Sequence, residues 1–211
     1  MMMINRRRVC GGKSLPYDAE IEYLESRNGA YIDTQVTAKH QTNIEIKLRF
    51  TGDVEQTAIP YGFYYLHKLS NRFYYRPASN SYVYVFHNAT TFNLLNMRSD
   101  SLWHTIQTDV NQFIIDSLSF QSSSSSYTGT TTCKFLLFGQ DVSNNGNTHS
   151  FSGTSDTSFV DIAYAKIFDG DTLIHDFIPV RVGQVGYMYD KVSGTLFGNA
   201  GTGDFILGPD V

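Results

Sequence analysis

Three glutamates near the start of the chain, Glu20, Glu22 and Glu25, are the first candidates for a catalytic role. Two carboxyl groups about 5–5.5 Å apart form the catalytic pair of a retaining glycosidase, where one attacks the sugar and the other donates a proton. On a regular strand, however, Glu20 and Glu25 point to opposite faces. We therefore interpret this segment as a first strand with solvated glutamates, and we expect no catalytic residues.

A second candidate is a group of oxygen donors at alternate positions, Asp141, Ser143 and Asn145, followed by Gly146. This spacing is typical of the start of a calcium loop, in which glycine makes the sharp turn. The closing glutamate of such a loop is missing, because Ser152 stands in its place. The sequence thus predicts at most a weak calcium site and no other cofactor. The competing interpretation is an Asn-Gly turn between two strands.

The third candidate is a run of aromatic residues between Tyr61 and Phe86. In its last part, tyrosine and phenylalanine alternate with Val83 and Val85, so the aromatic residues share one face of a strand. If the valines face the core, the rings are displayed to a glycan or a neighbouring subunit. The residues expected at such a contact are Tyr82, Tyr84, Phe86, Tyr64 and Tyr74. Packing in the core is an equal alternative, since alternation does not say which face is inward.

Charge divides the chain into a basic start and an acidic remainder. Residues 1–13 hold Arg6, Arg7, Arg8 and Lys13 with no acid, which leaves 12 of the 16 basic residues and all 20 acidic residues for the rest. An acidic body is unsuited to nucleic acid. We expect residues 1–16 to be an arm that anchors the chain on an acidic protein partner. A disordered basic tail is the alternative.

The two cysteines, Cys10 and Cys133, are too few and too far apart for a secreted disulfide scaffold, so we expect reduced thiols. No run approaches the roughly 18 apolar residues that a membrane span needs. No apolar segment follows Arg6–Arg8, so the sequence gives no sign of a secretory signal peptide.

We expect these candidate residues to lie on β-strands and on the turns between them. Asn43–Phe50 alternates between apolar and charged residues, which indicates a half-buried strand. Many other short segments are rich in aromatic and β-branched residues and end at turn residues, while no segment keeps a helical period. The sequence therefore predicts an all-β fold, a two-sheet antiparallel jelly-roll sandwich over residues 17–211, preceded by the short extended arm of residues 1–16.

Two segments resemble the concanavalin A-like lectin/glucanase group in its laminin G-like branch: LWHTIQTDVNQFIIDSLSF at 102–120, and residues 135–179, which end in FVDIAYAKIFDGDTLIHDFIPV. The head at 19–34 and the tail at 188–208 resemble a subset found in phage and gut-bacterial proteins, and this implies that head and tail strands pair. The pattern at 113–120 is apolar on both faces, so we expect a central, covered strand there, with Trp103 anchoring the core.

The resemblance implies a lectin-like domain of a kind that usually acts outside the cell that makes it, yet this sequence shows no export signal and has a basic arm. We therefore expect a non-enzymatic bacteriophage virion structural protein, such as a head fibre, capsid decoration or tail-associated protein. It would be made in the host cytoplasm, held to other virion proteins by its arm, and assembled as a homo-oligomer, for which a trimer is our expectation. Its lectin-like domain would bind host-surface carbohydrate. The first alternative is a carbohydrate-binding module of a gut bacterial surface protein, acting outside the cell. The second is a glycoside hydrolase, although glucanases of this group carry an Asp where this chain has Glu22.

Overall fold

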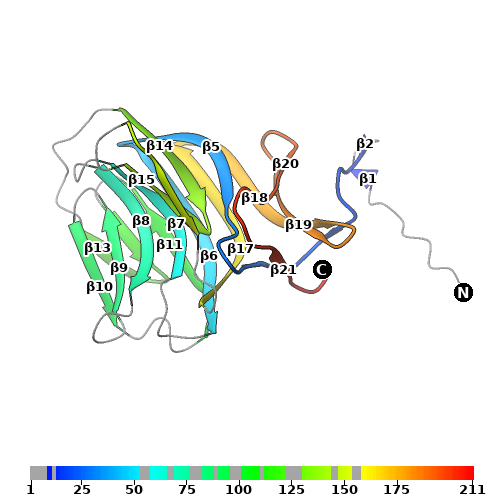
Figure 1. Ribbon diagram of the computed structural model, residues 1–211, viewed down its shortest axis with the longest axis horizontal. Coiled ribbons are helices and arrows are strands. Elements are labelled where there is room, and N and C mark those ends of the chain that lie inside the picture. Colours follow the sequence, from blue (N-terminus) through cyan, green and yellow to red (C-terminus); the bar gives the residue numbers. More distant parts are fainter. Residues whose placement is uncertain are drawn as a thin grey trace, which may run out of the picture.

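The structure is a computed structural model that describes residues 9–10, 13–52, 58–65, 69–76, 82–87, 90–95, 101–109, 112–121, 130–143, 147–153 and 158–211. Every helix or strand element in these ranges is a β-strand, and they form a jelly-roll-like sandwich of two large sheets (Figure 1). The all-β prediction is therefore confirmed. The same ranges contain no helix with the length and hydrophobicity that crossing a membrane requires.

The smaller of the two sheets has eight strands among the described residues, in the order β10-β9-β8-β7-β14-β5, with β15 and β16 attached beside β7. Its strands are β5 (Ile32–Lys39), β7 (Ala58–Tyr65), β8 (Leu69–Arg76), β9 (Tyr82–His87), β10 (Thr90–Leu95), β14 (Thr130–Leu137), β15 (Gly139–Ser143) and β16 (Ser150–Gly153). All pairs are antiparallel except that of β15 with β7.

The larger sheet has eleven strands among the described residues, in the order β13-β12-β11-β6-β17-β18-β19-β20, with β3, β4 and β21 attached. Its strands are β3 (Ala19–Glu20), β4 (Leu24–Ser26), β6 (Thr42–Gly52), β11 (His104–Thr108), β12 (Gln112–Ile115), β13 (Leu118–Gln121), β17 (Ser158–Asp169), β18 (Thr172–Val182), β19 (Val185–Asp190), β20 (Thr195–Phe197) and β21 (Phe205–Leu207).

The core lies between the two sheets and follows the alternation of β6. Its even-numbered residues from Ile44 to Phe50 are at most 1% exposed, while the odd-numbered ones face outward. Phe73 of β8 crosses the interface, with its ring centroid 5.7 Å from that of Phe50 and 6.4 Å from that of Phe113 of β12. Aromatic and aliphatic residues from both sheets thus form one continuous core.

The head and tail strands pair as predicted, because β21 is antiparallel to β4 with Ile206 opposite Glu25. Ahead of them, β1 (Val9–Cys10) and β2 (Lys13–Ser14) make a small hairpin of their own. This hairpin joins neither large sheet, and Figure 1 draws it outside the sandwich. The backbone of the predicted arm therefore contains a short antiparallel pair of strands.

Two expectations about the segment at 102–120 were wrong. Residues 113–120 are not one central strand: the chain turns at Asp116, whose φ is 51°, and returns as β13 at the end of the strand order. Trp103 does not anchor the core; it is partly exposed on the outer face of the large sheet, where it lies against Tyr23 and Arg49. Because the chain turns back at Asp116, the apolar residues of this segment belong to two short paired strands and not to one strand covered on both faces.

Candidate functional site

A hollow of about 260 Å³ opens on the outer face of the large sheet, where β6, β11, β12 and β17 meet. Its walls combine carboxylates and amides with apolar side chains. They are formed by Ile44, Glu45, Gln107, Thr108, Asp109, Gln112, Ile114 and Phe168. A space of this size is below that of a drug-sized pocket and suits one small ring.

The polar groups of the hollow are held by neighbouring side chains. Lys166 Nζ donates to Glu45 Oε1 at 2.9 Å, and Gln107 Nε2 donates to Glu45 Oε2 at 3.1 Å. The bond to Glu45 raises the pKa of Lys166. The amide of Asp109 donates to the carbonyl of Gln112 at 2.9 Å and so fixes the turn that carries both residues. The hollow therefore has preorganised hydrogen-bonding groups at its rim.

A second outward-facing cluster centres on Arg49, four residues along β6 from Glu45. Its guanidinium carbon lies 4.6 Å from the ring centroid of Trp103 and 4.8 Å from that of Tyr23. Its Nε donates to Asp161 Oδ2 of β17 at 2.6 Å. The arginine thus links two aromatic rings to a buried carboxylate.

The structure separates the three glutamates that the sequence places together. Glu20 accepts a hydrogen bond from the Tyr17 hydroxyl at 3.0 Å, and Glu22 is exposed. Glu25 is buried and lies directly opposite Asp161, a neighbour that sequence spacing gave no means of finding. Burial raises the pKa of Asp161; Arg49 opposes this rise and the charge of Glu25 adds to it.

Both carboxyl groups of this pair interact with other side chains of the protein. Arg27 Nε lies 2.5 Å from Glu25 Oε1, and the Thr51 hydroxyl donates to Glu25 Oε2 at 3.3 Å. Asp161 is 1% exposed beneath Arg49. The described hollow does not include either carboxyl group. Their arrangement is that of a structural ion network and gives a substrate no access.

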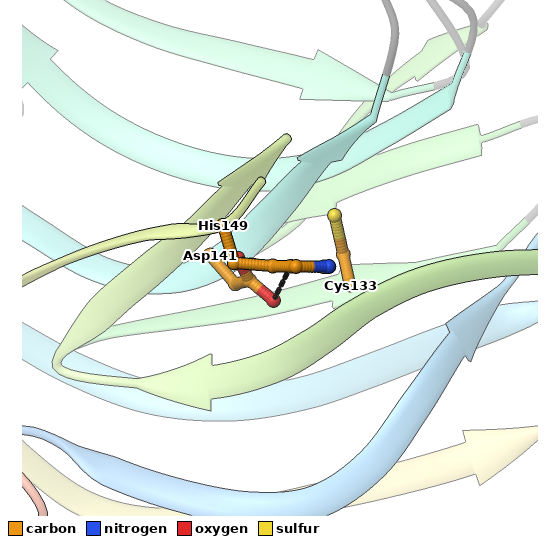
Figure 2. Close-up of side chains that lie close together, drawn as sticks. All are labelled: Cys133, Asp141 and His149. Carbon is orange, nitrogen blue, oxygen red and sulfur yellow. Dashed lines mark hydrogen bonds and ion pairs between the residues drawn. The ribbon is translucent and has the colours of Figure 1, made fainter. Parts of the chain in front are cut away.

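Three potential metal ligands meet in the smaller sheet: Cys133 of β14, Asp141 of β15 and His149, which precedes β16 (Figure 2). One donor atom from each lies within 4.8 Å of the other two. Asp141 accepts the backbone amide of Lys134 at 2.7 Å, and each of its oxygens lies 3.0 Å from His149 Nδ1. Sulfur, imidazole and carboxylate thus converge from three successive segments.

The local chain path explains this convergence. After β14, the chain reverses direction at Phe138. β14 pairs antiparallel with β7 at Tyr61 and Gly62, and β15 pairs in parallel with the next three residues of β7. The side chain of Asp141 then bonds to the β14 backbone. Burial raises the pKa of the Cys133 thiol to about 12; the charge of Asp141 adds to this rise and a hydrogen bond from Ser143 opposes it. Cys133 is therefore a poor nucleophile.

The other predicted site residues are only partly described. Asp141 and Ser143 are buried, while Asn145 lies outside the described residues, so the calcium loop stays a prediction. The same holds for the arm: Arg6, Arg7 and Arg8 lie outside, as does the side chain of Lys13. The strands of the aromatic run are present, with Tyr84 opposite Tyr74. The side chains of Tyr64, Tyr74, Tyr82, Tyr84 and Phe86 lie outside the described residues.

No protein-family model matches this sequence, and no curated protein and no solved structure shows a match to it. The resemblance to concanavalin A-like domains consequently remains an expectation drawn from sequence motifs.

Proposed function

We propose that this chain is a non-enzymatic structural component of a bacteriophage virion that displays a lectin-like sandwich and binds host-surface glycan. The contact would be made in the hollow between β6, β11, β12 and β17. The observation that carries the binding part of this proposal is the lining of the hollow, which combines carboxylate and amide residues with the apolar residues Ile114 and Phe168.

A sugar ring has hydroxyl groups around its edge and C–H groups on its faces. In the proposed complex, Gln107, Gln112 and the carboxylates of Glu45 and Asp109 would bond to hydroxyls, while Phe168 and Ile114 would contact a ring face. The lining residues include two carboxylates, and Lys166 beside Glu45 offsets the charge of one of them. The remaining negative charge favours a neutral sugar over an acidic one, because a sugar carboxylate would be repelled.

A glycoside hydrolase is the second candidate, because Glu45 and Asp109 line the same hollow. Hydrolysis requires one of two carboxyl groups to donate a proton to the leaving oxygen. Lys166 and Gln107 donate to the two different oxygens of Glu45, so both oxygens already act as hydrogen-bond acceptors within the protein. Binding without turnover is therefore the function that we propose.

Arrays of neutral and acidic glycans test this proposal, followed by titration calorimetry with the best neutral ligand. Gln107→Ala removes a group from the hollow and should weaken binding at least about tenfold, the effect of losing one or two hydrogen bonds. Gln184→Ala, at an exposed turn in the same sheet, is the matched control and should bind as the parent does.

Two outcomes would contradict the proposal. The first is equal affinity of the two glutamine variants, which would place glycan binding elsewhere or exclude it. The second is release of new reducing ends from the bound glycan, abolished by Asp109→Asn, which would establish the hydrolase instead.

A further inference from the structure

We infer that Cys133, Asp141 and His149 form a binding site for zinc, independent of the glycan contact proposed above. The three residues offer one thiol sulfur, one carboxylate oxygen and one imidazole nitrogen within 4.8 Å of one another. Zinc takes this combination of sulfur, nitrogen and oxygen ligands, typically four in number and tetrahedral. Three protein ligands leave the fourth position for water, as in open zinc sites.

The donor set selects zinc over calcium. Calcium requires six to eight oxygen ligands, which a site containing a thiol and an imidazole does not supply. Sulfur and imidazole ligands suit zinc and neighbouring transition metals. The carboxylate of Asp141 contacts the imidazole, and the Cys133 sulfur lies beside this pair, so an ion there would meet all three groups (Figure 2).

The ligands are preorganised by contacts that do not depend on a metal. Asp141 is fixed by the amide of Lys134, and the imidazole of His149 stacks on Phe151, with ring centroids 6.2 Å apart and planes 18° from parallel. Phe151 in turn stacks on Tyr31 at 6.3 Å. A site held in this way loses little conformational freedom on binding an ion.

The site also has an entry path. Asp141 is fully buried and Cys133 is buried, whereas 23% of the His149 side chain is exposed. An ion can therefore reach the imidazole from solvent and then contact the carboxylate and the sulfur behind it. The water ligand would occupy the same exposed side.

A contact between a histidine and an aspartate does not by itself distinguish this cluster. Two other histidine–aspartate pairs have comparable geometry: His104 Nδ1 lies 2.8 Å from Asp116 Oδ2, and His175 Nδ1 lies 2.9 Å from Asp190 Oδ2. Among the described residues, only the pair at Asp141 also has a cysteine within reach. The other two pairs consequently provide internal controls.

The test uses the full-length chain, reduced and freed of metal with a chelator, and titrated with zinc chloride in a calorimeter near neutral pH. We expect one zinc ion per chain with low-micromolar or tighter affinity. Cobalt chloride is the second probe, because a cobalt–thiolate bond adds an intense absorption band in the near ultraviolet. Cys133→Ser and His149→Gln should each weaken zinc binding at least about tenfold. Cys133→Ser should also abolish the cobalt–thiolate band.

His104→Gln is the matched control and should bind zinc as the parent does. Near-ultraviolet circular dichroism confirms that each variant is folded before titration. No zinc binding by the folded parent would overturn the inference. So would binding that survives Cys133→Ser with an unchanged cobalt spectrum, or calcium binding in the absence of zinc binding. None of these outcomes bears on the glycan hollow, whose residues are separate.

Discussion

At the scale of single residues, the best-defined group is the buried carboxylate of Asp190 at the end of β19. It lies 2.9 Å from His175 Nδ1 and accepts the backbone amides of Asp176, Val192 and Ser193 at 2.8–3.1 Å. Burial alone would raise the pKa of Asp190, but the hydrogen bonds from its neighbours outweigh burial and lower it to about 2. The residue therefore closes the β19–β20 turn and attaches it to β18.

Asp190→Asn should destabilise the chain by about 2–3 kcal/mol at neutral pH, because three backbone amides and His175 lose a buried, charged acceptor. The folded-state pKa is below the ordinary value of 3.8, so the stabilisation is complete above that pH and is lost as the pH falls through about 2. Urea unfolding at neutral pH and near pH 2 should show a large difference between parent and variant that shrinks in acid.

Asp176→Asn is the matched control for this experiment. Asp176 makes a partly exposed ion pair with Lys191 at 2.9 Å, which contributes at most about 1 kcal/mol. An Asp190→Asn variant no less stable than Asp176→Asn would contradict the role assigned to the buried carboxylate.

The sequence identifies candidate functional residues more readily than it identifies the residues that contact them in the fold. The spacing of Asp141 to Ser143 and Asn145 predicts a calcium loop, yet its hydrogen-bond partners are the Lys134 amide and His149, with Cys133 close by. The chain reversal at Phe138 brings these residues together. A positive φ at a buried phenylalanine leaves no sequence signal. The hollow was not predicted at all, because its lining comes from four strands that become neighbours only in the folded sheet.

At the scale of elements, the tail is locked to the head by close backbone contact. A Cβ atom on Gly201 would lie 2.0 Å from the carbonyl oxygen of Gly29, and one on Gly203 would lie 2.2 Å from that of Arg27. Asn199 Oδ1 accepts the amides of Tyr31 and Gly201 at 3.2 and 2.8 Å, which ties the same loop to the head. These contacts continue the pairing of β21 with β4.

Gly201→Ala should therefore displace the tail loop and cost about 1–3 kcal/mol of stability, as overpacking against an unyielding neighbour does. Gly198→Ala is the control, since its new methyl group would be 3.2 Å from the Tyr187 ring, a side chain that can move. Thermal unfolding compares the two variants, and limited proteolysis reports whether the tail is released. Equal stability and equal protection of the tail in both variants would show that the lock is unimportant.

Strands with clear alternation were predicted well, and edges were predicted poorly. The segment at 43–50 became β6, and the head–tail pairing followed from the two terminal segments. The segment at 113–120 misled because two apolar faces indicate either a covered strand or a hairpin, and the turn at Asp116 decides between them. The expectation that Trp103 anchors the core depended on the same covered strand, whereas the structure places its ring against Arg49 on the outer face.

At the scale of the molecule, the chain combines an acidic sandwich with a basic start. Deleting residues 1–16 should leave the thermal stability of the sandwich unchanged, because β1 and β2 pair with neither large sheet. The same deletion should abolish incorporation into phage particles if the arm anchors the chain, because its four basic residues are then lost. Quantitative mass spectrometry of purified particles measures this. Normal incorporation of the deletion variant would contradict the anchor proposal.

The claim on which the proposed function depends is that a neutral sugar occupies the outer hollow of the large sheet and leaves unchanged. A titration of the isotope-labelled chain with a neutral host-surface glycan, followed by two-dimensional nuclear magnetic resonance, tests it most directly. We predict that the largest shifts fall on the amides of Glu45, Gln107 and Gln112, while the sugar signals persist without new products. Shifts confined to other surfaces, no shifts with any glycan, or steady conversion of the sugar would contradict the account.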